Sequence, residues 1–108
     1  MRITPSIFAI IIVYTNNQMP IIFDPAKRRQ TLIHRGLDMA RANEIFEGVT
    51  LTIPDDRQDY GEPRFITIGY LDQRMVIVVW TPRGVDERII SLRKANEREQ
   101  KIYQQRLG

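Results

Sequence analysis

Residues 74–81 read Arg-Met-Val-Ile-Val-Val-Trp-Thr, and this stretch constrains the fold most strongly. Its six consecutive apolar residues, 75–80, include four β-branched ones, which favours an extended strand. Alternate side chains of a strand point to opposite faces of a sheet, so an unbroken apolar run has to be covered on both sides. The pattern therefore predicts a central strand over residues 74–81.

Three further strands are expected around it. Residues 49–53 alternate apolar and hydroxyl side chains, which is typical of a strand with one polar face. Residues 64–71 lead into Asp72-Gln73, a two-residue turn that joins them to the central strand as a hairpin. After a turn at residues 82–84, residues 87–92 form the last strand. We expect a four-stranded antiparallel meander.

Two helices are predicted before this sheet. Asp24 can cap a helix over residues 25–35, Pro25 suits its first position, and Gly36 can end it. A second helix is expected between Asp38 and Gly48. Its apolar residues share one face at helical spacing: Met39, Ala42, Ile45 and Phe46.

A C-terminal helix completes the predicted fold. Residues 94–107 are mostly polar, with Ala95, Ile102 and Tyr103 as a sparse apolar stripe suited to a surface helix laid across the sheet. The predicted class is α+β, with two N-terminal helices, a four-stranded antiparallel sheet and a C-terminal helix.

The length of 108 residues fits one domain, which we expect over residues 19–108. Residues 1–18 are interpreted as an N-terminal extension, with Met19 as a candidate natural start. The apolar run at residues 7–14 is shorter than the roughly 20 residues that a membrane helix needs, and it reads alternatively as an extra strand. The early residues are also a poor secretory signal, so a cytoplasmic protein without a membrane segment is expected.

The composition excludes several kinds of site. Without cysteine, the chain cannot build a disulfide framework or a thiolate zinc site. With one histidine, it cannot build a histidine-rich metal site. It also lacks a glycine-rich phosphate loop and a G-x-S-x-G turn. Asp55, Asp56 and Asp59 share a loop that could attract a divalent cation, but they do not follow the calcium-loop pattern. We expect no metal and no cofactor.

Arginine dominates the positive charge. The net charge is +3, and 13 of the 16 basic residues are arginine, whose planar guanidinium suits phosphate. In an antiparallel sheet Arg64 and Arg83 should lie near the same edge, and Arg88 and Arg93 bracket the last strand. The cluster predicts an RNA or phosphate site. Surface ion pairs with Glu62, Asp86 and Glu87 are the alternative interpretation.

Several motifs, taken together, resemble one known family. They are Phe23-Asp24-Pro25-Ala26-Lys27, Gly61-Glu62-Pro63-Arg64-Phe65 with Ile68-Gly69, Thr81-Pro82-Arg83-Gly84, Arg88-Ile89-Ile90-Ser91 with Arg93-Lys94-Ala95, and Glu97-Arg98-Glu99 with Tyr103. In order and spacing they resemble the BrnT family of bacterial type II toxins, from residue 19 to about residue 106. The resemblance implies a RelE-like fold and metal-independent endoribonuclease activity. It also implies a BrnA-like ribbon-helix-helix antitoxin, through which alone the toxin would reach operator DNA.

The resemblance also points to site residues. It implies Lys27, Arg64 and Arg83 as active-site cations, with Arg88 and Arg93 in support. Where the family usually reads Asn-x-x-Lys-His-Gly, residues 31–36 read Thr-Leu-Ile-His-Arg-Gly. The histidine is displaced by one position, which rotates a helical side chain by about 100°.

A mechanism and a competing interpretation follow. Arg64 and Arg83 would hold the scissile phosphate while the ribose 2′-hydroxyl attacks it. Lys27 or His34 would assist proton transfer, and Arg35 is expected to bind RNA. His34 is otherwise an ordinary cation at a helix C-terminus. The competing class is a non-catalytic basic module that only binds RNA or docks a partner.

Overall fold

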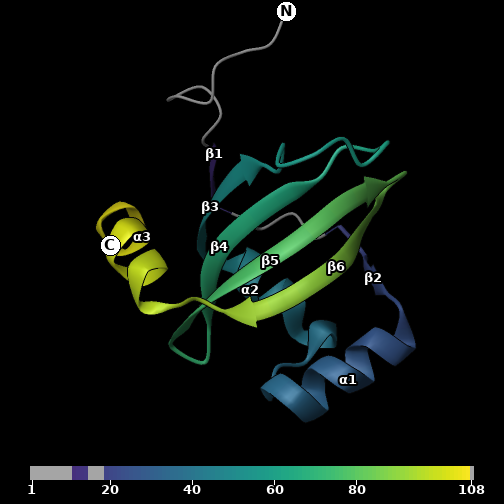
Figure 1. Cartoon of the computed structure of the whole chain (residues 1–108), viewed down its shortest axis with the longest axis horizontal. Helices are drawn as coiled ribbons and strands as arrows, with labels where there is room; N and C mark the ends of the chain where they lie inside the picture. The colour runs from purple at the N-terminus through teal and green to yellow at the C-terminus, as the bar shows by residue number, and fades with distance from the viewer. Residues whose placement is uncertain (1–10, 15–18, 108) are drawn as a thin grey trace, which may run out of the picture.

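The computed structural model describes residues 11–14 and 19–107 (Figure 1). The elements, in chain order, are β1 (Ile11–Tyr14), β2 (Ile21–Phe23), α1 (Pro25–Arg35), the 3-10 helix η2 (Met39–Arg41), α2 (Ala42–Glu47), β3 (Val49–Pro54), β4 (Phe65–Leu71), β5 (Arg74–Arg83), β6 (Asp86–Lys94) and α3 (Glu97–Leu107). The α+β class and the predicted helix, strand and turn order from α1 onward are confirmed. None of the helices in the described part of the chain has the length and apolar content that spanning a membrane requires.

The sheet has six strands in the order β1-β3-β4-β5-β6-β2, so the prediction of four antiparallel strands is wrong in number and type. The meander β3 to β6 is antiparallel as predicted, and β1 extends it antiparallel to β3. At the other edge β2 pairs parallel to β6, where the Glu87 N–H donates to the oxygen of Pro20 at 2.8 Å. A three-residue strand has no periodicity to detect, which is why β2 escaped prediction.

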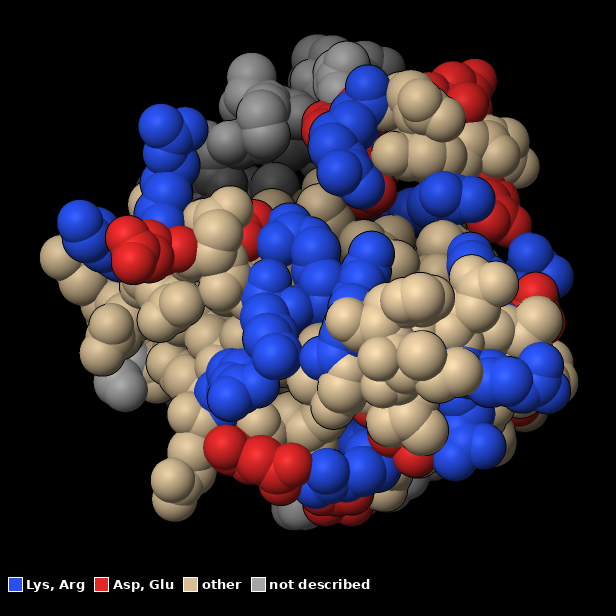
Figure 2. Space-filling view, turned by 60° about the horizontal axis from the view of Figure 1, so that its bottom comes forward, with Lys and Arg blue, Asp and Glu red and all other residues tan. Residues whose placement is uncertain are grey.

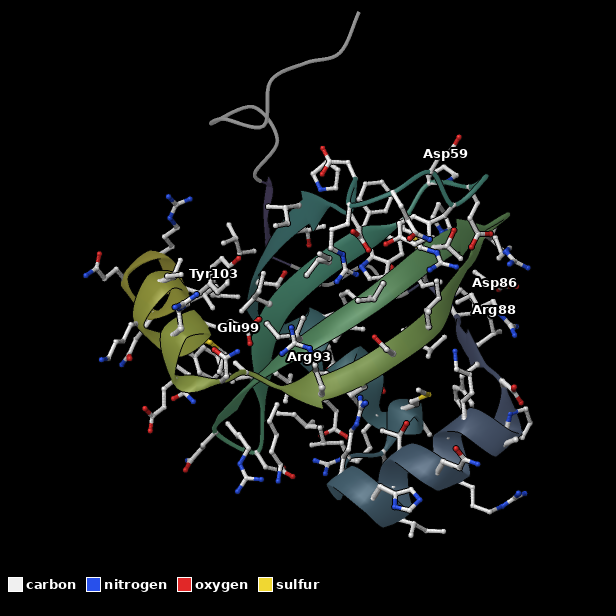
Figure 3. All side chains as sticks on the ribbon, viewed as in Figure 1. Asp59, Asp86, Arg88, Arg93, Glu99 and Tyr103 are labelled. Atoms are coloured by element: carbon white, nitrogen blue, oxygen red, sulfur yellow. The ribbon has the colours of Figure 1, made fainter. Side chains whose placement is uncertain are left out.

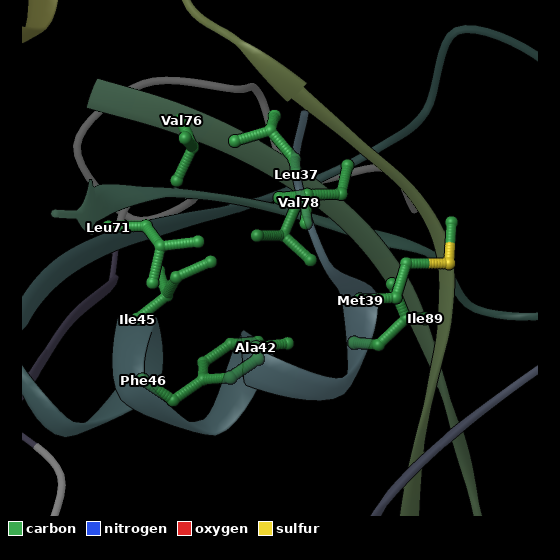
Figure 4. Packing of buried hydrophobic residues seen from close by; sticks show 10 residues of the cluster. Leu37, Met39, Ala42, Ile45, Phe46, Leu71, Val76, Val78 and Ile89 are labelled. Atoms are coloured by element: carbon green, nitrogen blue, oxygen red, sulfur yellow. The ribbon is translucent and has the colours of Figure 1, made fainter. Parts of the chain in front are cut away.

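Strand β5 is central and covered on both faces, as its apolar run predicts. Residues 75–79 are all buried. One face, here the helix face, packs Val76 and Val78 against residues of η2 and α2 (Figure 4). The opposite face, here the α3 face, packs Met75 and Ile77 with residues that include Leu51, Ile68 and Ala95, and Tyr103 and Leu107 of α3 lie against them.

The helices begin where the capping residues indicate. The Asp24 carboxylate accepts the N–H of Ala26 at 3.0 Å, and Gly36 ends α1 with a φ of 69°. The second predicted helix is a 3-10 turn followed by the short α2. Its four expected core residues are all buried: Met39, Ala42, Ile45 and Phe46. In α3 the expected place of Ile102 in the apolar stripe is wrong, because this side chain is 50% exposed.

The predicted two-residue hairpin turn joins β4 and β5. Asp72 and Gln73 form it with φ values of 51° and 65°.

Helix α2 packs closely on β4 at Gly69. A Cβ built on this residue would lie 2.8 Å from the Ile45 side chain and 3.0 Å from that of Thr50. Glycine at this position therefore lets α2 approach the sheet.

Candidate nucleic-acid site

The end of the sheet where β4 begins and β5 ends carries two arginines on one carboxylate. Phe65 pairs with Trp80, which brings the last residues of β5 beside the loop that precedes β4. Arg64 donates from Nε to one oxygen of Glu62 at 3.3 Å, and Arg83 donates from Nη2 to the other at 3.1 Å. We call these three residues the Glu62 cluster. The prediction that Arg64 and Arg83 lie together is confirmed, and so is the ion pairing with Glu62 that the alternative interpretation proposed.

The loop that carries Glu62 is held at both ends. The Asp55 N–H donates to the oxygen of Arg64 at 2.8 Å, which closes the loop beside the sheet. The Thr81 hydroxyl donates to the oxygen of Pro63 at 2.6 Å, which ties the loop to β5. The guanidinium of Arg64 also lies over the Tyr60 ring, 4.1 Å from its centre. These contacts preorganise Arg64, whose side chain is 26% exposed, while Arg83 is 51% exposed and freer to turn.

Two guanidiniums around one carboxylate leave this cluster with a net charge of +1. Arginine presents five N–H donors, so each guanidinium keeps donors beyond its contact with Glu62. An excess of positive charge with unused donors suits a bound phosphate. The arrangement can hold an anion and stabilise additional negative charge that develops on it.

Arg88 adjoins the cluster on the neighbouring strand. It is the register partner of Thr81, and neighbouring strands lie about 4.8 Å apart. Figure 3 shows Arg88 near Asp86 at the start of β6, next to β2. Arg88 therefore lies next to Thr81, the residue whose hydroxyl ties the loop to β5.

Arg93 lies at the other end of β6, where its side chain contacts α3. It lies five positions along the strand from Arg88, or roughly 16 Å. Its guanidinium makes two hydrogen bonds to Glu99, of 2.8 and 2.7 Å (Figure 3). The main-chain N–H of Asn96 donates to the Glu99 carboxylate, and that of Glu99 donates to the Asn96 side chain, which is a capping box. The Arg93 guanidinium holds the pKa of Glu99 below its usual range. Arg93 is thus an anchor for α3.

A second group of predicted residues lines a pocket between α1 and β6. The pocket has a volume of about 450 Å³ and is lined by Lys27, Gln30, Thr31, His34, Arg35, Met39, Ile90 and Ser91. Lys27, His34 and Arg35 meet there because residues seven and eight apart lie on one side of a helix. Arg35 donates from Nη1 to the oxygen of Leu92 at 2.8 Å. Neither Arg64 nor Arg83 lines this pocket, so the structure separates the expected site cations into two groups.

The carboxylates of Asp55 and Asp59, in the loop between β3 and β4, make separate contacts. The Asp55 side chain is fully buried and receives two hydrogen bonds from Arg57, of 2.7 and 2.8 Å. That guanidinium also holds the pKa of Asp55 below its usual range. Asp59 instead accepts the N–H of Gly61 at 2.9 Å and shapes the turn before Glu62. Across residues 11–14 and 19–107, no three His, Asp or Glu side chains are grouped to hold a metal ion.

Sequence reasoning missed two members of the site. It treated Glu62 only as an ion-pair partner and did not consider Tyr60. The available signal was the segment Gly-Glu-Pro-Arg at residues 61–64, where a glycine and a proline indicate a turn and the glutamate lies two positions before the arginine.

The surface of the protein carries a band of positive charge. Lysine and arginine side chains gather across the middle of the face in Figure 2.

Comparison with known families gives a match over most of this arrangement. Residues 23–99, more than two thirds of the chain, match the family described as ribonuclease toxin, BrnT, of type II toxin-antitoxin system. The matched segment includes the Glu62 cluster, Lys27 and Arg88. No curated protein matches the chain.

Proposed function

The chain belongs to the BrnT family of type II ribonuclease toxins, and on that premise we propose that it is an endoribonuclease that needs no metal ion. Cleavage of RNA would inhibit translation and growth. The observation that carries the proposal is the convergence of Arg64 and Arg83 on one carboxylate at the end of the sheet. Their permanent positive charges can stabilise the negative charge that develops on a phosphodiester during cleavage. A metal ion has this role in metal-dependent enzymes.

The reaction is an intramolecular phosphoryl transfer. Arg64 and Arg83 would bind the non-bridging oxygens of the scissile phosphate, and Arg88 the neighbouring phosphate. The ribose 2′-oxygen attacks phosphorus and the bond to the 5′-oxygen breaks. The products are a 2′,3′-cyclic phosphate and a 5′-hydroxyl end. Loss of one preorganised donor typically lowers the rate by ~10² to 10³.

The pocket between α1 and β6 is proposed to hold RNA beside the scissile phosphate. Lys27, His34 and Arg35 line it, and they are separate from the Glu62 cluster. This placement supports contacts to flanking nucleotides more than the proton transfer expected of Lys27 and His34. Arg93 is proposed to act through α3, since its guanidinium is bound to Glu99.

A toxin of this type has an antitoxin partner. We propose that the partner is a BrnA-like ribbon-helix-helix protein. The antitoxin would carry the contacts to operator DNA.

Cleavage of end-labelled RNA in EDTA tests the proposal. The parent chain is compared with the Arg64→Ala/Arg83→Ala variant and with Arg41→Ala, purified identically. Arg41 is a matched control because its guanidinium binds Glu44 and Asp72, and Asp72 lies in the turn at the end of the β4–β5 hairpin opposite to the Glu62 cluster. We expect cyclic phosphate ends from the parent and from Arg41→Ala, and at least a 100-fold lower rate from the double variant.

Other outcomes would redirect the proposal. Cleavage that EDTA abolishes would contradict a metal-independent reaction. RNA that the parent binds but leaves intact would favour the non-catalytic binding module. Such binding would weaken steeply with salt.

A further inference from the structure

We propose that Glu62 is the general base of this reaction and takes the proton from the attacking 2′-hydroxyl. The inference rests on the proposed function and adds a catalytic residue to it. In the step, the 2′-oxygen gives its proton to the Glu62 carboxylate as it bonds to phosphorus. The bond from phosphorus to the 5′-oxygen breaks, and the 5′-oxygen takes a proton from solvent. Glu62 then returns its proton to solvent.

The charge balance distinguishes Glu62 from the other carboxylates that contact arginine. Glu62 is shared by two guanidiniums, which leaves an excess positive charge. Asp38, Asp55 and Glu99 each bind one guanidinium, so those pairs are neutral. Arg41 is shared by two carboxylates, which leaves an excess negative charge. Of these ion pairs, the Glu62 cluster alone attracts a phosphate and places a carboxylate beside it.

The contacts of Glu62 are also the longest of the set. Its oxygens receive one hydrogen bond each, at 3.3 and 3.1 Å. Asp55 and Glu99 are held by two bonds of 2.7 to 2.8 Å from a single guanidinium. Longer bonds are weaker, and the Glu62 side chain is 26% exposed. A phosphate can therefore take over donors of Arg64 and Arg83 while Glu62 stays next to it and accessible.

The other candidate bases are placed less favourably. An arginine stays protonated at neutral pH and cannot accept the proton. Lys27 and His34 lie in the pocket between α1 and β6, which does not include Arg64 or Arg83. The Asp55 carboxylate is buried and bound to Arg57. Proton transfer requires hydrogen-bond reach of the reacting group, and Glu62 already contacts both residues that would hold the phosphate.

The test separates chemistry from binding. Glu62→Gln keeps the size of the side chain and removes the base. We expect kcat to fall by ~10² to 10⁴, the usual contribution of a general base. Affinity for RNA with a single 2′-deoxy nucleotide at the cleavage site, measured by fluorescence anisotropy, should be unchanged or higher, because the variant loses a competing negative charge. Retained binding shows that the variant is folded.

Two further variants sharpen the result. Glu62→Asp should recover part of kcat, because it restores a carboxylate at this position. Asp86→Asn is the control, since Asp86 is the register partner of Arg83 and its loss removes the same charge nearby. This control should keep the parental rate.

Two results would overturn the inference. If Glu62→Gln cleaves at the parental rate or faster, Glu62 only occupies the phosphate site of a working ribonuclease. If the parent chain leaves RNA intact, the proposed function fails and the role of Glu62 fails with it.

Discussion

The guanidinium of Arg35, in the last turn of α1, donates a hydrogen bond of 2.8 Å to the main-chain oxygen of Leu92 in β6. Helix α1 has no buried residue, so little apolar packing holds it in place. A second tertiary anchor of α1 is the ion pair between Arg28 and Asp38, with contacts of 2.7 and 3.0 Å. Arg35 therefore fixes the end of α1 against the edge of the sheet.

Arg35→Ala should loosen α1 without unfolding the sheet. A hydrogen bond from a charged, partly exposed group contributes on the order of 1 kcal/mol. We expect the free energy of unfolding to fall by about this amount in urea titrations, and amide exchange in α1 to accelerate. Arg29→Ala, a change of an exposed arginine on the same helix, is the control. Equal urea midpoints for the two variants would show that the bond to Leu92 contributes nothing.

Glu87 should make the protein less stable as the pH rises. It is 9% exposed, and one of its carboxylate oxygens has no hydrogen-bond partner among the described residues. Burial raises its pKa from an ordinary 4.5 to about 7. The folded chain then holds this proton more tightly than the unfolded chain. Stability is therefore highest below about pH 4.5 for this group, falls as the pH rises to about 7, and is level beyond.

Between about pH 4.5 and pH 7, the free energy of unfolding should fall by on the order of 3 kcal/mol because of Glu87. Urea titrations at intervals from pH 5 to pH 8 measure it. Glu87→Gln should flatten the curve and be more stable than the parent at pH 8, whereas Glu47→Gln, a change of an exposed residue, should follow the parent. A parental pH dependence in Glu87→Gln would contradict the account.

Asp55 should act in the opposite direction at low pH. Its hydrogen bonds with Arg57 lower its pKa, so the folded chain favours the charged carboxylate. That contribution is present above the ordinary pKa of aspartate and is lost as the pH falls below it. Asp55→Asn should therefore lower stability at pH 6 and reduce the further loss between pH 4 and pH 2. Acid titrations followed by circular dichroism measure the difference. Parallel curves for parent and variant would refute it.

Arg93→Ala should separate anchoring from catalysis. The change removes two hydrogen bonds to Glu99, and because the pair is partly exposed we expect a loss of about 1 kcal/mol. RNA cleavage should stay within about 10-fold of the parent, far from the ~10²-fold loss expected for an arginine of the Glu62 cluster. A loss as large as that of Arg64→Ala, measured below the melting range of the variant, would place Arg93 in the site.

The sequence by itself determined the elements whose patterns are long or chemically distinct. The apolar run of residues 75–80 predicted a strand covered on both faces, and Asp24, Pro25 and Gly36 predicted the ends of α1. The nearness of Arg64 and Arg83 also followed, because the register of an antiparallel hairpin relates its two ends.

Only the tertiary structure decided the rest. Strand β2 exists because the edge of β6 supplies hydrogen-bond partners to three residues that carry no pattern of their own. Lys27 is separate from Arg64 because α1 is anchored at that edge through Arg35, and local periodicity does not encode where a helix docks. Glu62 joins two arginines that are 19 residues apart in the chain, at positions 64 and 83, and such a contact forms only when the sheet closes.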